Sequence, residues 1–147
     1  GKVMTDLPIA MLPARHAKSG IVRRIFFRDL SLSCRMGIHD FERAGPQRIV
    51  VNVDLYLAAE PLPRADDIAE VIDYDFLRAD IAALAGSRHF NLQETFVHAI
   101  CDLCLDRPGV IAVRVSSAKP DVYPDCAAVG YEAIRIKGSR RQHRTAR

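Results

Sequence analysis

Two neighbouring stretches in which apolar and polar residues alternate constrain this chain more than any other feature of its sequence. They cover residues 25–36 and 47–58 and flank a loop with the sequence GIHDFERAGP. The apolar face of the first stretch includes Leu30, Leu32, Cys34 and Met36, and that of the second is formed by Ile49, Val51, Val53, Leu55 and Leu57. Because alternate side chains of a strand point to opposite faces, each stretch predicts a half-buried strand, and together they predict an antiparallel pair.

The spacing of apolar residues changes from strand-like to helical in the middle of the chain. After an irregular, proline-containing crossing, helical spacing appears in residues 73–87, where Gly86 is placed to end the helix, and again in about residues 92–106. Two segments rich in β-branched residues, 110–119 and 127–137, then flank a loop with two prolines. This ββααββ order predicts an α+β fold in which a four-stranded antiparallel sheet carries both helices on one face.

The length of the chain predicts a single domain. With 147 residues, of which 49% are hydrophobic, it can form one core but not two. We expect the folded domain over residues 23–138. Residues 1–22 show no sustained period and predict a flexible arm, in which Met4 is a candidate native start that would leave residues 1–3 as a remnant of the expression vector. Residues 139–147 are predicted to be a disordered basic tail.

Positive charge is concentrated at the C-terminal end. Residues 137–147 hold one Lys, four Arg and no acid, so the rest of the chain is net acidic although the total charge is +3. A basic tail without aromatic residues favours a solubilising end over a nucleic-acid-binding segment. No apolar run is long enough to span a bilayer, and the first residues lack the apolar core of a secretory signal. We therefore expect a soluble, cytoplasmic protein with no membrane partner.

The chain has four cysteines, Cys34, Cys101, Cys104 and Cys126. Cys101 and Cys104 form a C-x-x-C, a spacing that zinc sites and redox centres also use. They fall within the second helical pattern rather than at its N-terminus, and no second pair of ligands completes a tetrahedral site. Buried cysteines on a helix face are therefore favoured, and no metal site is predicted.

Four polar residues lie at the edges of the predicted elements, where functional groups are usually mounted: Glu42, Tyr74, Glu94 and Lys119. Each also has a purely structural interpretation. Glu42 belongs to the segment GIHDFER, which taken alone could be a metal site, a catalytic loop or a solvated polar turn. Tyr74 could pack its ring under the sheet, and Lys119 could be a solvated charge at the end of a strand. Glu94 could close a capping box with Asn91.

Taken together and in order, the motifs that hold these residues resemble those of the dihydroneopterin aldolases over about residues 23–137. The matching segments are GIHDFER after the first strand, DDIAEVIDYDFL leading into the first helix, FNLQETF at the start of the second helix and VRVSSAKP at the end of the third strand. The resemblance implies a tunnelling fold, in which subunits join their sheets into a tetrameric barrel and two barrels stack into a homo-octamer with active sites between subunits. Such closure would also protect the unpaired edges of the predicted sheet.

The resemblance also implies a reaction. Dihydroneopterin aldolases act in folate biosynthesis and cleave 7,8-dihydroneopterin, a pterin, into 6-hydroxymethyl-7,8-dihydropterin and glycolaldehyde. Removal of the 2'-hydroxyl proton breaks the C1'–C2' bond in a retro-aldol step, and the electrons flow into the C6=N5 imine of the substrate. Because the substrate supplies its own electron sink, neither a metal ion nor a cofactor is implied.

The matching motifs carry residue roles with them. Glu94 would hold the pterin ring through its carboxylate, with the backbone of Leu92 and Gln93 lining the same pocket. Ile72 would pack against the ring. The family often has an apolar residue at the position of Gln93, so this side chain departs from the family pattern.

The remaining roles concern proton transfer. Lys119 would be the general acid and base, and Glu42 would orient substrate hydroxyls and water. Tyr74, from a neighbouring subunit, would shuttle the proton at the developing hydroxymethyl carbon. Because this chemistry needs no metal ion, the interpretation of GIHDFER as a metal site is no longer favoured. Gly37 is expected to let the chain turn out of the first strand.

Other activities are compatible with the same motifs. Epimerisation at C2', which gives 7,8-dihydromonapterin, would use the same residues. A relative acts on the triphosphate, but no basic triad beside these motifs favours that substrate. An oxygenase activity is associated with loss of the tyrosine that this chain retains as Tyr74. A catalytically silent pterin-binding paralogue is the alternative from a different class, although it would have no chemical reason to retain all four polar residues.

Overall fold

The sheet is antiparallel, and its strands lie in the order in which they occur along the chain. A computed structural model describes residues 20–59, 62–67 and 71–138. The strands are β1 (Arg23–Cys34), β2 (Gln47–Leu57), β3 (Val110–Lys119) and β4 (Val129–Ile136), in the order β1-β2-β3-β4. All three neighbouring pairs are antiparallel, which confirms the predicted sheet. Most of the predicted N-terminal arm and the whole predicted basic tail lie outside the described residues.

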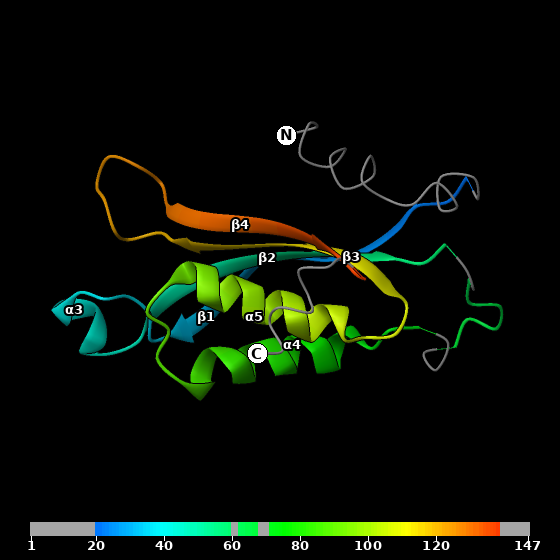
Figure 1. Cartoon of the computed structure of the whole chain (residues 1–147), viewed down its shortest axis with the longest axis horizontal. Coiled ribbons are helices and arrows are strands. Elements are labelled where there is room, and N and C mark those ends of the chain that lie inside the picture. Colours follow the sequence, from blue (N-terminus) through cyan, green and yellow to red (C-terminus); the bar gives the residue numbers. More distant parts are fainter. Residues whose placement is uncertain (1–19, 60–61, 68–70, 139–147) are drawn as a thin grey trace.

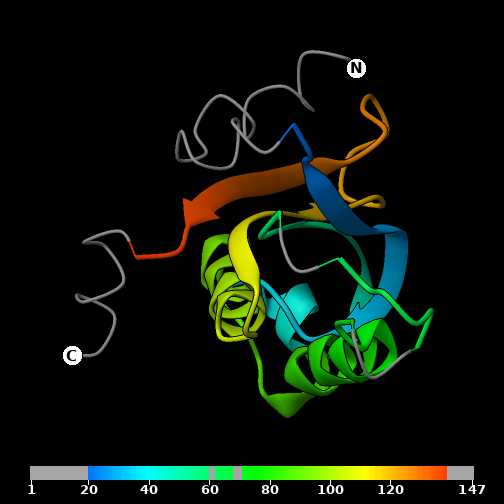
Figure 2. The same cartoon turned by 90° about the vertical axis from the view of Figure 1, so that its right-hand side faces the viewer.

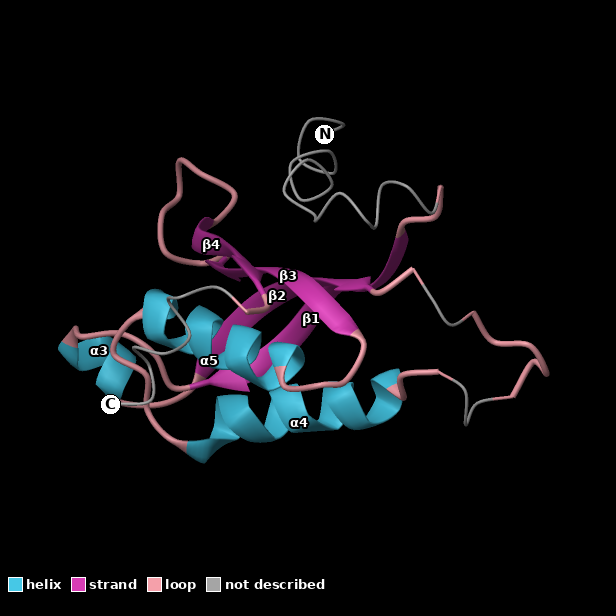
Figure 3. Cartoon of the chain, turned by 45° about the vertical axis from the view of Figure 1, so that its right-hand side comes forward, coloured by secondary structure: helices cyan, strands magenta, loops and turns pink. Residues whose placement is uncertain are grey.

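Two helices cover one face of this sheet, as predicted (Figure 1, Figure 3). They are α4 (Tyr74–Ser87), which contacts β1, and α5 (Gln93–Leu105), which contacts β3 and β4. Figure 2 shows the pair beneath the sheet from the end of the molecule. The start of α4 is fixed by Asp73, whose side chain accepts hydrogen bonds from the backbone N–H groups of Asp75 and Phe76.

The helix ends differ from the sequence interpretation in two places. α4 continues past Gly86 and is followed by extended backbone at Arg88, so Gly86 does not end the helix. The N-cap of α5 is Leu92, which makes no side-chain capping hydrogen bond, and Glu94 is the second helical residue. The alternative in which Glu94 closes a capping box with Asn91 is therefore wrong.

A one-turn helix, α3 (Asp40–Arg43), occupies the segment that was expected to be an irregular loop. The backbone just before it is tied to the turn that precedes α5. Gly37 donates its N–H to the Phe90 carbonyl at 2.8 Å, and Phe90 donates to the Arg35 carbonyl at 2.9 Å. This short bridge places α3 near the start of α5, and Figure 1 and Figure 3 both show α3 at that end of the molecule.

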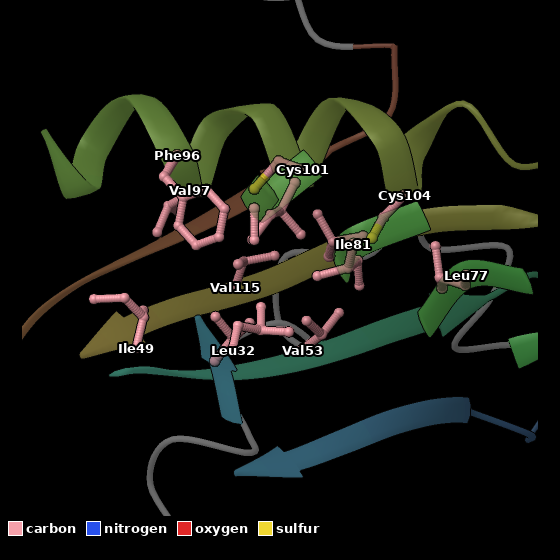
Figure 4. Close-up of a cluster of buried hydrophobic side chains, with 14 of the residues drawn as sticks. Leu32, Ile49, Val53, Leu77, Ile81, Phe96, Val97, Cys101, Cys104 and Val115 are labelled. Carbon is pink, nitrogen blue, oxygen red and sulfur yellow. The ribbon is translucent and has the colours of Figure 1, made fainter. Parts of the chain in front are cut away.

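The hydrophobic core lies between the sheet and the two helices. Figure 4 shows side chains from the strands, among them Leu32, Ile49, Val53 and Val115, together with Leu77 and Ile81 of α4 and Phe96 and Val97 of α5. Cys101 and Cys104 belong to this core as free thiols, as predicted. Burial raises the pKa of each to about 12, so both are protonated and unreactive at neutral pH.

Candidate active site

An open cavity of about 410 Å³ lies at the end of the molecule that holds α3. Its walls come from the α3 segment, the first turn of α5, the end of β3 and the loop that leads into β4. The lining residues are Gly37, Ile38, His39, Phe41, Glu42, Asn91, Leu92, Gln93, Glu94, Lys119, Val122, Tyr123 and Val129. Segments far apart in the sequence therefore meet here. Figure 1 shows α3, the start of α5, the end of β3 and the start of β4 at the same end of the molecule.

A lysine–carboxylate ion pair lies in this cavity. Lys119 Nζ donates to Glu42 Oε2 at 2.6 Å, and only 12% and 6% of the two side chains are exposed. Burial alone would raise the pKa of Glu42, but the Lys119 ammonium, the His39 backbone N–H and the Gln47 amide hold that pKa below its ordinary value of 4.5. The alternatives of an exposed loop carboxylate and a solvated strand-end lysine are therefore wrong.

Gly37 leaves the space that the Glu42 carboxylate occupies. Its φ is +119°, a conformation that side chains rarely adopt, and a Cβ at this position would lie 2.1 Å from Glu42 Cδ. The turn of α3 then brings the carboxylate back toward the strand, where the His39 backbone N–H donates to Glu42 Oε1 at 3.3 Å. The sequence suggested a glycine needed for a turn, whereas the structure adds a close approach between this glycine and the carboxylate.

The first turn of α5 forms another wall of the cavity. Leu92 and Glu94 are exposed there, and no hydrogen bond within the described ranges engages the Glu94 carboxylate. Gln93, in contrast, accepts a hydrogen bond from Ser117 Oγ at 2.6 Å and donates one to the Val129 carbonyl at 3.3 Å. The backbone N–H groups at the start of a helix lack intrahelical partners and can donate to a ligand. This wall thus offers a carboxylate acceptor next to backbone donors.

The cavity brings together most of the residues predicted for the site, namely Glu42, Leu92, Gln93, Glu94 and Lys119. It does not include the other two. Tyr74 begins α4 and is 52% exposed, and Ile72 packs half-buried against the core nearby. Since α4 has 14 residues, it separates these positions from the cavity end of the molecule by about 20 Å of helix. The exposed fraction of Tyr74 also shows that packing of its ring under the sheet is wrong.

Several cavity residues were not identified from the sequence. Phe41 and Tyr123 line the cavity although they are 76% and 56% exposed. Asn91 also lines it, and its side-chain oxygen accepts a hydrogen bond from Arg43 at 2.9 Å. The position of Tyr123, four residues after Lys119, is the only signal that could have indicated it, because a loop that follows a functional strand end often contacts the same ligand.

The described part of the chain holds neither a cluster of metal ligands nor a helix that could span a membrane. Within residues 20–59, 62–67 and 71–138, no three side chains of His, Cys, Asp or Glu gather into a group that could hold a metal ion, and the GIHDFER acids and histidine are no exception. No helix in the described part of the chain combines the length and the apolar character needed to cross a membrane.

The fold and the cavity define a single α+β unit with a largely buried lysine–carboxylate pair at the end of a sheet, an arrangement suited to proton transfer. Comparison with known proteins places this unit in a family. The sequence model for "FolB: Dihydroneopterin aldolase" matches residues 25–134. A dihydroneopterin aldolase of Methylorubrum extorquens is 32% identical over 114 residues, which cover 77% of this chain and 87% of that protein. The chain belongs to the dihydroneopterin aldolase family.

Solved structures agree with this assignment. A dihydroneopterin aldolase from Burkholderia thailandensis bound to guanine has 40% sequence identity and a TM-score of 0.71, covering 85% of this chain and 99% of that one. Escherichia coli dihydroneopterin aldolase in complex with neopterin has 23% identity and a TM-score of 0.68, covering 77% and 98% of the two chains, and supports the fold alone.

Proposed function

We propose that this protein is a dihydroneopterin aldolase of folate biosynthesis, which cleaves 7,8-dihydroneopterin into 6-hydroxymethyl-7,8-dihydropterin and glycolaldehyde. The observation that carries the proposal is the Lys119–Glu42 pair in the same cavity as Glu94. The pair can transfer protons, and the free carboxylate can hold a heterocycle beside it. The family membership of the chain supports the same reaction.

Glu94 is the proposed anchor for the pterin ring. A carboxylate can accept two parallel hydrogen bonds from the 2-amino group and the adjacent ring N–H, and an amide cannot accept both. Guanine and neopterin, which relatives hold in their structures, both present this edge. The backbone of Leu92 and Gln93 lines the same wall of the cavity.

Lys119 and Glu42 are the proposed proton-transfer groups. Lys119 in its neutral form accepts the 2'-hydroxyl proton, the C1'–C2' bond breaks, glycolaldehyde leaves, and the bonding electrons enter the C6=N5 imine. The proton that Lys119 has taken up then passes to C1', with Tyr74 of a neighbouring subunit as the relay, which completes the hydroxymethyl product and restores the imine, so no redox partner is needed. Glu42 orients the hydroxyls and water. We propose that the reaction is independent of metal ions because the imine accepts the electrons.

We further propose that the site is shared between subunits of a homo-octamer, in which sheets join side by side into tetrameric barrels. Two observations support this. Tyr74 and Ile72 lie at the far end of α4 from the cavity, so a neighbouring copy is the source from which they can reach it. β1 and β4 are the outer strands of the sheet and offer unpaired edges for such a junction. A cytoplasmic location fits the free cysteines among the described residues.

The proposed function is tested by product analysis. The purified protein is incubated with 7,8-dihydroneopterin, with and without EDTA, and the pterins and aldehydes are separated. Equal formation of 6-hydroxymethyl-7,8-dihydropterin and glycolaldehyde under both conditions is the expected result. Accumulation of 7,8-dihydromonapterin without glycolaldehyde would replace the aldolase by an epimerase, and loss of turnover in EDTA would refute metal independence. No turnover at all would favour a silent pterin-binding protein.

A further inference from the structure

The side-chain amide of Gln93 connects the first turn of α5 to two strands. Its Oε1 accepts a hydrogen bond from Ser117 Oγ at 2.6 Å, and its Nε2 donates to the Val129 carbonyl at 3.3 Å. The opposite orientation of the amide would place its oxygen against the Val129 carbonyl, so these two partners fix which end faces which strand. Both ends of the amide are thus engaged within the protein.

Ser117 and Val129 are also neighbours of Lys119 in the sheet. Ser117 precedes Lys119 by two positions on β3 and therefore lies on the same face of that strand. Val129 is the partner of Lys119 in the β3–β4 ladder. Glu94 directly follows Gln93 in α5. One side chain therefore links the helical turn that carries Glu94 to the strand end that carries Lys119.

The strands have little freedom to adjust at this point. Ser117 is only 1% exposed, so water cannot readily replace Gln93 as the partner of its hydroxyl. β4 also approaches β3 very closely at Gly130, where an added Cβ would lie 2.3 Å from the Ser117 carbonyl oxygen. Gly130 follows Val129 directly, so the carbonyl that Gln93 contacts is held in place by this approach. The link joins a helix end to a rigid strand end.

We propose that Gln93 is a positioning residue, which sets the geometry between the pterin-binding carboxylate of Glu94 and the proton-transferring amine of Lys119; this inference rests on the proposed function. Gln93 acts in this way through its neighbours and touches no reacting atom. Without it, the first turn of α5 shifts relative to the end of β3, while Glu94 keeps its own contacts with the pterin. Turnover should therefore fall more than affinity, because the reacting groups lose alignment.

The test compares Gln93→Leu with a matched control in the full-length protein. Leucine has a similar volume but makes neither hydrogen bond. Thr95→Val, at an exposed position of the same turn, removes a polar group that has no hydrogen bond to other described residues. For Gln93→Leu we expect kcat to fall about tenfold, since misplacement of about 1 Å can cost on the order of 100-fold. Its Kd for neopterin should stay within about threefold of the wild type, and Thr95→Val should change neither value.

A double-mutant cycle tests whether Ser117 acts through Gln93. Ser117→Ala alone should lower kcat, and the double variant with Gln93→Leu should be no slower than Gln93→Leu by itself, because the shared contact can be lost only once. Additive losses would mean that the two side chains act separately. An unchanged kcat in Gln93→Leu, or losses of kcat and neopterin affinity that match a loss of folded protein, would overturn the positioning role.

Amide hydrogen exchange separates this inference from the proposed function. If the wild-type protein binds neopterin but does not cleave 7,8-dihydroneopterin, the proposed function fails and the link is still judged by exchange. Faster exchange in the first turn of α5 and the start of β4, seen in Gln93→Leu but not in Thr95→Val, supports the link. Equal exchange in both variants overturns it.

Discussion

The two ends of this molecule hold different parts of one inferred site. At the α3 end, Lys119 and Glu42 are locked together at 2.6 Å in a cavity that also contains Glu94. At the start of α4, Tyr74 is 52% exposed and its hydroxyl makes no hydrogen bond within the described ranges. The α3 end therefore has several polar groups that are already paired or face the cavity, and the start of α4 has a single exposed polar group and contributes no residue to that cavity. The proposed site shared between neighbouring copies would account for this difference.

Removal of the lysine at the cavity end should have the largest effect. Lys119→Ala takes away the proposed general base, and we expect turnover of 7,8-dihydroneopterin to fall by about 10²–10⁴-fold. Neopterin should still bind, because Glu94, the proposed anchor, is intact. The measurements are steady-state kinetics and a neopterin titration. Lys137→Ala is the control, since that lysine bonds the Arg107 carbonyl away from the cavity. Undiminished turnover in Lys119→Ala would exclude the base role.

The tyrosine at the other end should have the next largest effect. Tyr74→Phe removes only the hydroxyl, and we expect kcat to fall by about 100-fold because a proton donor is lost. Tyr123→Phe is the matched control, since Tyr123 lines the cavity of its own chain. A larger loss in Tyr123→Phe than in Tyr74→Phe would move the proton-shuttling role to the tyrosine of the same chain.

Subunit mixing tests whether the two ends meet between copies. Inactive Lys119→Ala and Tyr74→Phe proteins are unfolded together and refolded as a mixture. If each site combines a cavity from one subunit with a tyrosine from the next, about a quarter of the sites in a random mixture regain both groups. Activity should then rise to about a quarter of the wild-type value, by the same arithmetic. A mixture no more active than its components would show that both groups come from one chain.

Replacement of Glu94, the proposed anchor for the pterin ring, should weaken ligand binding more than it slows the reaction. Glu94→Gln keeps the shape of the side chain but removes one acceptor and the charge. A hydrogen bond to a charged group contributes about 1.5–3 kcal/mol, so we expect neopterin to bind about 10- to 100-fold more weakly. Isothermal titration measures the affinity. Glu132→Gln, on the opposite face of the sheet, should bind like the wild type, and equal affinities of the two variants would remove the anchor role.

The sheet was predictable because the face of a strand is a local property of the sequence. The alternation in residues 47–58 predicts which side chains of β2 enter the core between sheet and helices, and Ile49, Val51, Val53 and Leu55 do so. It does not predict that Asp54 and Tyr56, on the other face, are buried as well. The alternation does not predict an irregularity in β1. Its pairing shifts between Phe27 and Leu30, and Asp29 has a φ of 55° and donates its N–H to the Asn52 side chain at 2.8 Å. A bulge of this kind depends on the partner strand, which no local pattern reports.

The site was predictable only in part, for a similar reason. Motif order identified Glu42 and Lys119, but their contact joins positions 77 residues apart and required the fold. The close approach of Gly37 to Glu42 and the link from Gln93 to Ser117 leave no signal in either segment alone. The sequence also could not exclude that Glu42 and Lys119 are simply exposed to solvent. Their burial and their contact with each other had to be seen in the structure, because a sequence does not show which partner a loop carboxylate has.

The ion pair at the cavity end should also contribute stability that depends on pH, and this is the smallest of the expected effects. Because the pKa of Glu42 is lowered on folding, the ionised carboxylate stabilises the native state above its unfolded value of about 4.5 and loses this contribution as the pH falls through the folded value. Glu42→Gln should therefore be less stable than the wild type at pH 7, by about 1 kcal/mol. The difference in the free energy of unfolding should shrink below about pH 4.5.

Urea unfolding at several pH values from 7 to 3 measures this difference. Asp121→Asn is the control, because it replaces an exposed carboxylate two residues after Lys119 that has no ion-pair partner among the described residues. The control should show a small difference that does not change with pH. A difference for Glu42→Gln that stayed constant down to pH 3 would mean that the carboxylate gains nothing from its ionised form on folding. The contact between Lys119 and Glu42 would then still distinguish the cavity end from the start of α4, but as an observed distance and not as a contribution to stability.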